Sequence, residues 1–153
     1  MEHNPVNHPL RPMYRALGFL TGAYLVVFGI VGLIQTSGKS FTGNTGVRVL
    51  GQQSNLLWSI IALALGALVV LATAAGRNLD TGADKFIGWA LLVVGSYELA
   101  TARTDATFFG FSIATVVVTY LVGLILITVS LYSKVAPPTE AGAPRQVRES
   151  QAA

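Results

Sequence analysis

One acidic residue inside a long apolar run is the first candidate for chemistry in this chain. Glu98 lies in the run from Phe86 to Ala102, with Arg103 five residues further along the chain. A carboxyl group inside a bilayer is costly, so such a residue usually has a partner or a function. Three interpretations follow: Glu98 pairs with an arginine (Arg103, or Arg48 of the first loop) near the outer interface, it is a neutral acid bonded to hydroxyl groups, or it handles protons or cations.

Two further acids, Asp80 and Asp84, lie between Arg77 and Lys85 in a short segment that connects two apolar runs. We interpret them as solvated loop charges or as caps of the helix that follows. On that interpretation, the chain has no paired carboxylates at helical spacing.

The remaining residue types offer little catalytic chemistry. His3 and His8 stand five residues apart in a tail broken by prolines, so we expect solvated side chains and no metal site. The chain has no cysteine, which excludes disulfides and thiol chemistry. P-loop, HExxH and G-x-S-x-G motifs are also missing. We therefore predict no enzymatic activity, no cofactor and no metal.

Four apolar runs must position these residues. Each run is close to the ~20 residues that a helix needs to cross a bilayer, and only 11% of the chain is charged. The predicted fold is an all-α, four-helix transmembrane bundle that forms one integral membrane domain over residues 1–153. The predicted spans are residues 14–35, 55–76, 85–103 and 108–133, with a long loop between the first two and disordered tails at 1–12 and 134–153.

The basic residues predict the orientation of the bundle. The first span is too long for a typical signal peptide and lacks a cleavage site, so we expect it to be retained. Seven Lys and Arg residues lie on the side that carries both tails, and three lie on the other side. Because cytoplasmic loops are rich in Lys and Arg, we expect both termini in the cytoplasm. The scattered basic residues form no stripe for nucleic acid.

Small residues recur on one face of each predicted helix. Membrane helices pack along such faces because small side chains let backbones approach closely. We expect this for eight glycines: Gly18, Gly22, Gly29, Gly32, Gly66, Gly88, Gly95 and Gly123. The alternatives are a dimer contact through Gly18 and Gly22, and a polar cavity lined by Asn55, Ser59, Thr73, Thr115 and Thr119.

The second span also carries a resemblance. Asn55, Leu57, Leu63 and Gly66 fit a stretch typical of a family of small four-span actinobacterial membrane proteins, domain of unknown function 4383. Trp58 and Ala62 stand where that family has two histidines. The resemblance implies the same fold and a bacterial inner membrane. It implies no activity. Because the two histidines are missing, the resemblance implies no metal-binding or proton-handling role for this chain.

These observations favour a non-enzymatic, structural or accessory membrane component. It would act through helix packing with itself, as a homo-oligomer, or with a larger membrane complex, surrounded by lipid in the cell membrane. The alternative is a small transporter or channel that uses Glu98. The candidate functional residues are Glu98, Arg103, Asn55, Ser59 and Thr119.

Overall fold

The computed structural model describes residues 6–138 of the 153-residue chain. Within them lie four helices, α1 (Arg11–Thr36), α2 (Leu56–Ala75), α3 (Leu79–Thr101) and α4 (Ile113–Tyr132). Two short antiparallel strands, β1 (Arg48–Val49) and β2 (Gln52–Gln53), form a small hairpin between α1 and α2. The predicted all-α, four-helix bundle is confirmed.

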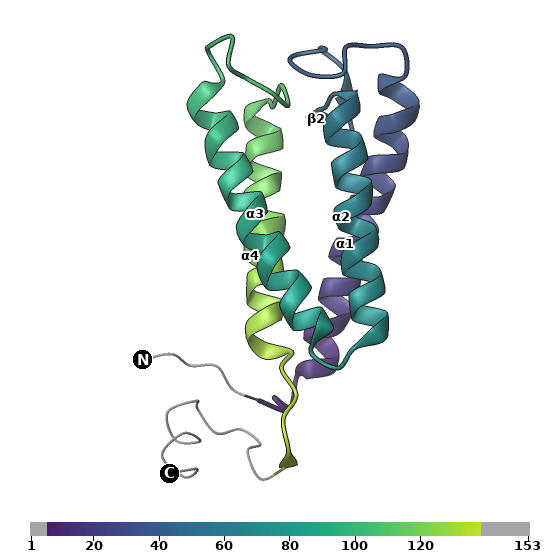
Figure 1. The fold of residues 1–153 in the computed structure, drawn as a ribbon, viewed down its shortest axis with the longest axis vertical. Helices are drawn as coiled ribbons and strands as arrows, with labels where there is room; N and C mark the ends of the chain where they lie inside the picture. Colours follow the sequence, from purple (N-terminus) through teal and green to yellow (C-terminus); the bar gives the residue numbers. More distant parts are fainter. Residues whose placement is uncertain (1–5, 139–153) are drawn as a thin grey trace.

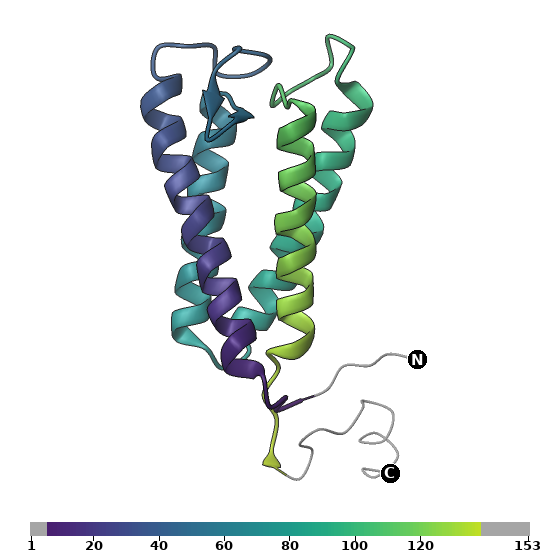
Figure 2. The same ribbon diagram turned by 180° about the vertical axis from the view of Figure 1, so that it is seen from behind.

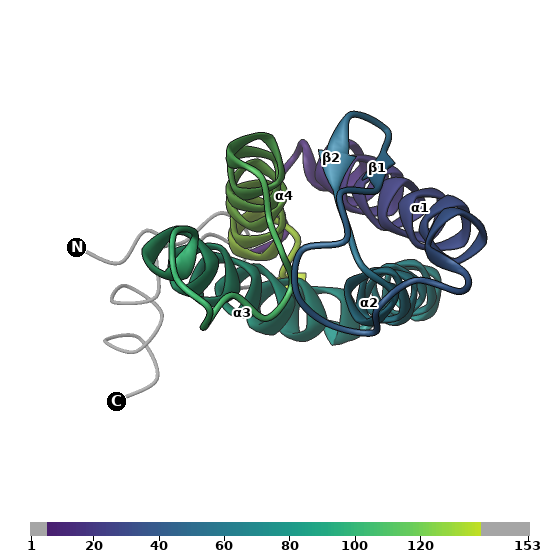
Figure 3. The same cartoon turned by 90° about the horizontal axis from the view of Figure 1, so that it is seen from above.

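The helices form two pairs, α1 with α2 and α3 with α4 (Figure 1). Segments 6–10, 76–78 and 133–138 lie at one end of the bundle, called here the tail end. Segments 37–55 and 102–112 lie at the other, called the loop end. The two pairs approach each other at the tail end and diverge toward the loop end (Figure 2). The view along the helices shows the hairpin of β1 and β2 above the space between α1 and α4 (Figure 3).

Glycines bring the two helices of each pair into backbone contact. A Cβ atom at Gly29 would lie 2.6 Å from the backbone nitrogen of Leu63, and one at Gly66 would lie 2.6 Å from that of Val26. In the other pair, Cβ atoms at Gly88 and Gly123 would lie 2.8 and 2.9 Å from each other's carbonyl oxygen. The glycine faces therefore lie inside the protein, between its own helices. Four further glycines have close neighbours on other helices: Gly18, Gly22, Gly32 and Gly95.

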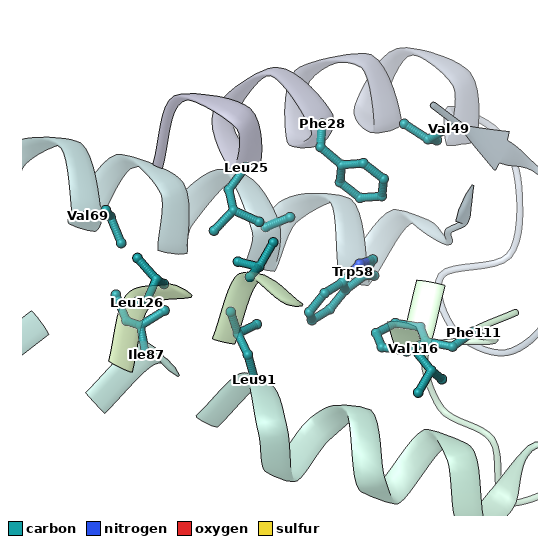
Figure 4. Packing of buried hydrophobic residues seen from close by; sticks show 12 residues of the cluster. Leu25, Phe28, Val49, Trp58, Val69, Ile87, Leu91, Phe111, Val116 and Leu126 are labelled. Carbon is teal, nitrogen blue, oxygen red and sulfur yellow. The ribbon is translucent and has the colours of Figure 1, made fainter. Parts of the chain in front are cut away.

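Large side chains fill the space where the two pairs diverge. Phe28 of α1, Trp58 of α2 and Leu91 of α3 are each no more than 3% exposed (Figure 4). Val49 and Phe111 join this cluster from the two loop-end segments. The loop end is thus closed by packed hydrophobic residues that the loops contribute.

Three of the described helices, α1, α2 and α4, are long and apolar enough to cross a membrane. The helix of the third predicted span, α3, differs from these three because it carries Asp80, Asp84, Lys85 and Glu98. Its three acids are buried against the bundle, each no more than 1% exposed. Its outer face is apolar, with Phe86 75% exposed and Val93 67% exposed. The charges of α3 are therefore mostly turned inward.

Several predicted boundaries need correction. The third helix begins at Leu79 and not near residue 85, so Asp80 and Asp84 are helical and buried. The fourth begins at Ile113 and not at residue 108, because residues 107–111 fold back over the bundle.

The tails also differ from the prediction of disorder in the part that the structure describes. The first helix starts at Arg11, ahead of the predicted residue 14. Val6 is fully buried, and the Asn7 amide N–H donates to the Lys134 carbonyl at 3.0 Å. Asn7 thus joins the start of the described chain to Lys134 and Ala136. The rest of the predicted tails, with His3, lies outside the described residues.

Candidate functional site

Glu98 lies in the last turn of α3 and is fully buried. Its Oε1 accepts hydrogen bonds from the backbone N–H groups of Phe108 and Phe109, both at 2.9 Å. Its Oε2 accepts from the Thr107 hydroxyl at 2.8 Å and from the Phe111 N–H at 3.3 Å. The carboxylate therefore holds the segment between α3 and α4 against the bundle.

The arginine partner predicted for Glu98 is absent from this site. Arg103 is exposed, and the ion pairs found within residues 6–138 join Arg11 and Arg15 to Asp80 instead. The segment between α3 and α4 is irregular, so its backbone N–H groups are not used within a helix. Three of them bind the Glu98 carboxylate in place of an arginine. A hydroxyl partner was one of the predicted alternatives, and the Thr107 hydroxyl supplies one of the four hydrogen bonds.

Asn55 plays a similar part in the neighbouring loop. It caps α2 by accepting from the Trp58 N–H at 2.9 Å, and its side-chain nitrogen donates to the carbonyls of Gly43 and Phe108. Since it is fully buried, Asn55 joins both loops to the start of α2. Ser59 is bonded within the same region, to the Asn55 carbonyl at 2.8 Å and to Ser54.

Thr119 bonds back to the Thr115 carbonyl of its own helix at 2.8 Å. It borders an interior cavity of about 10 Å³ that also touches Tyr24, Gln52 and Trp58. Such a volume has room for about one water molecule. Of the five residues predicted to line a polar cavity, only Thr119 borders this one, and Asn55, Ser59, Thr73 and Thr115 do not.

A second buried polar cluster lies at the tail end, where all four helices meet. The Asp80 Oδ2 atom is 3.1 Å from the Arg15 Nε and 3.9 Å from an Arg11 nitrogen. Arg15 also donates to the Thr73 carbonyl of α2, and Arg11 donates to the Ser133 carbonyl at 2.8 Å. Two arginines of α1 thus connect α2, α3 and the end of α4.

Asp84 lies one helical turn deeper than Asp80 and is 0% exposed. Neither of its carboxylate oxygens has a hydrogen-bond partner among the described residues. The hydroxyls of Thr73 and Ser133, which are buried at the same end, also have none. The prediction that Asp80 and Asp84 are solvated loop charges is wrong.

The sequence contained a signal for this cluster. Asp80, Asp84 and Gly88 follow one another at intervals of four residues, and Gly95 and Glu98 continue the same face. The two aspartates therefore extend the small-residue face of α3 by two turns. A predicted helix start near Lys85 leaves both aspartates outside the helix, and so hides this continuation of its face.

A large apolar groove runs along the outside of the bundle between α2 and α3. It measures about 640 Å³. Leu68, Leu71 and Phe86 are exposed along it, while Ala75 and Gly82 are among its small residues. The groove exists because α2 and α3 contact each other much less than the helices within each pair do.

No protein-family model, curated protein or solved structure matches this chain. The resemblance of the second span to a family of small membrane proteins therefore stays a prediction.

Proposed function

We propose that this protein is a non-enzymatic component of the cell membrane that acts by associating with another membrane-embedded chain. In this proposal all four helices cross the membrane and both termini are cytoplasmic. Three helices meet the length and composition of a span. The apolar outer face of α3, with its acids turned inward, is compatible with a fourth.

The closed interior is the observation that favours association over transport. The pocket between the helix pairs beside Gln52 and Thr119 holds about 10 Å³, which is far too small for a solute path. Glu98, the residue on which transport was predicted to depend, has all its hydrogen bonds within the protein. Transport through Glu98 is therefore disfavoured.

Association needs a surface other than the glycine faces, because those are used between the protein's own helices. The groove between α2 and α3 is such a surface. It has protruding side chains, Leu71 at 65% and Phe86 at 75% exposure, beside a hollow at Gly82. A patch with both protrusions and a hollow can pack against a copy of itself about a two-fold axis. We therefore take a second copy of this chain as the partner to test first.

The absence of cysteine makes a clean experiment possible. Gly82→Cys places one thiol in the groove, and Val117→Cys places one on the exposed face of α4, where Val117 is 50% exposed. After mild oxidation in native membranes, we expect a disulfide-linked dimer from Gly82→Cys and a monomer from Val117→Cys. Equal cross-linking at both positions, or a monomer from both, would contradict the proposal. A cross-link to a different protein would point to a larger complex instead.

A groove-filling variant provides the second test. A Cβ atom at Gly82 would have no neighbour within 4 Å, so Gly82→Trp should fold normally. We expect it to weaken the association, whereas Val117→Trp should leave it unchanged. A Gly82→Trp variant that associates like the wild type would show that the groove is not the contact surface.

A further inference from the structure

The four helices converge on one point at the tail end, beside Gly18. A Cβ atom at Gly18 would lie 3.4 Å from the Asp84 Oδ2, 3.9 Å from the Thr73 Oγ1 and 3.1 Å from a methyl group of Val129. Asp84, Thr73 and Val129 come from α3, α2 and α4. The Asp84 carboxyl group and the Thr73 hydroxyl therefore approach the same small space from different helices.

Neither of these two groups has a partner in the described part of the chain. Both Asp84 oxygens and the Thr73 Oγ1 lack a hydrogen bond, and the two residues are 0% and 6% exposed. The arginines at this end lie beside Asp80, with the Arg15 Nε 3.1 Å and an Arg11 nitrogen 3.9 Å from the Asp80 Oδ2. The Arg15 Nε and the Asp80 Oδ2 are within ion-pair distance but form no hydrogen bond. The helices α2 and α4 contain no charged residue that could compensate Asp84.

An ionised carboxylate without donors is strongly disfavoured in a buried place. Protonation removes its charge and creates an O–H donor, and a threonine hydroxyl oxygen can accept a hydrogen bond. The neighbouring acid, Asp80, further opposes ionisation of Asp84, because like charges close together disfavour each other.

We propose that Asp84 is a proton-binding site, at which a neutral carboxyl group faces Thr73 in the folded bundle at neutral pH. The nearest acid along the same helix is Asp80 of α3, and beside Asp80 lie Arg11 and Arg15 of α1, with side chains 24% and 30% exposed. α2 contributes Thr73, and α4 contributes Val129.

The test uses the full chain in lipid nanodiscs, with ¹³C in the carboxyl groups of aspartate. The chain has three aspartates, Asp80, Asp84 and Asp105, so the spectrum is simple. We expect one carboxyl group to titrate near neutral pH in sodium-free buffer. Its signal should disappear in Asp84→Asn and persist in Asp105→Asn, where the substituted residue is exposed.

A second variant keeps the test decisive if Asp84→Asn does not fold. Asp80→Asn removes the neighbouring negative charge and frees Arg15 to approach Asp84, and both changes favour the ionised form. We expect proton binding at Asp84 to become at least about tenfold weaker. The proposal is overturned if every aspartate of the wild type is already ionised above about pH 5. It is also overturned if the neutral-pH signal responds to sodium ions and not to pH.

Discussion

Two buried acids on one face of α3 have opposite surroundings. Glu98, near the loop end, accepts four hydrogen bonds, whereas Asp84, near the tail end, accepts none from the described residues. Both side chains are 0% exposed. The difference follows from the backbone around each acid. Residues 107–111 are not helical, so their N–H groups are free to bind Glu98. Asp84 is enclosed by helices, whose N–H groups are already used within each helix.

The comparison shows that burial alone does not define what an acid does in a membrane protein. Glu98 is an anchor because the fold supplies donors for its charge. Asp84 has no donor among the described residues, and the two arginines at this end lie beside Asp80. The two sites therefore predict different responses to the same kind of substitution.

The largest effect is expected for Glu98→Ala. It leaves three backbone N–H groups and one hydroxyl without their acceptor, and an unsatisfied buried donor costs about 1–3 kcal/mol. We expect the free energy of unfolding in detergent to fall by about 3–5 kcal/mol. The control is Asp105→Ala, which removes an exposed acid from the same end. Similar losses for both variants would mean that Glu98 is not an anchor.

A smaller loss is expected for Arg15→Met. This change removes the nearer cation from Asp80, which is only 1% exposed, and a donor to the Thr73 carbonyl. We expect a loss of about 1–3 kcal/mol in thermal or chemical unfolding. Arg77→Met removes an exposed arginine at the same end and should have little effect. If the two variants behave alike, the pair of Arg15 and Asp80 does not stabilise the tail end.

Glu98→Gln tests which hydrogen bonds matter. The amide oxygen can replace one carboxylate oxygen, but the NH₂ group cannot accept the hydrogen bond of Phe108 and Phe109 or that of Phe111. We therefore expect the free energy of unfolding to fall by about 1–2 kcal/mol. An amide that kept every hydrogen bond of the acid would leave it unchanged. A variant as stable as the wild type would show that the contact to Phe111 is dispensable.

The smallest effect at neutral pH is expected for Asp84→Asn, within about 1 kcal/mol of the wild type. Its informative feature is the pH dependence. If the folded state holds a proton that an unfolded aspartate releases near pH 4, stability from this group falls as pH rises from about 4 toward neutral. The stability of the wild type relative to Asp84→Asn should therefore fall between about pH 4 and pH 7 and level off above that. A difference that is constant with pH would indicate that Asp84 is ionised throughout.

Much of the fold could be predicted because helix periodicity is local. The small-residue faces followed from spacing alone, and the glycines on them do lie at close helix contacts. The site residues were harder. Asp80 and Asp84 were assigned to a loop because charged residues usually mark the end of an apolar run, although their spacing continues the face of α3.

The sequence by itself determined four helices, their small-residue faces and the presence of an acid near the end of the third. These features depend on residues three or four positions apart, and such spacings can be read directly from the sequence. Only the tertiary structure decided which groups each acid meets. Glu98 is bonded by a segment that folds back over the bundle, whereas Asp84 meets no donor among residues 6–138 where the four helices converge. Such partners depend on where distant segments come to lie in space, and this is why spacing along the chain did not predict them.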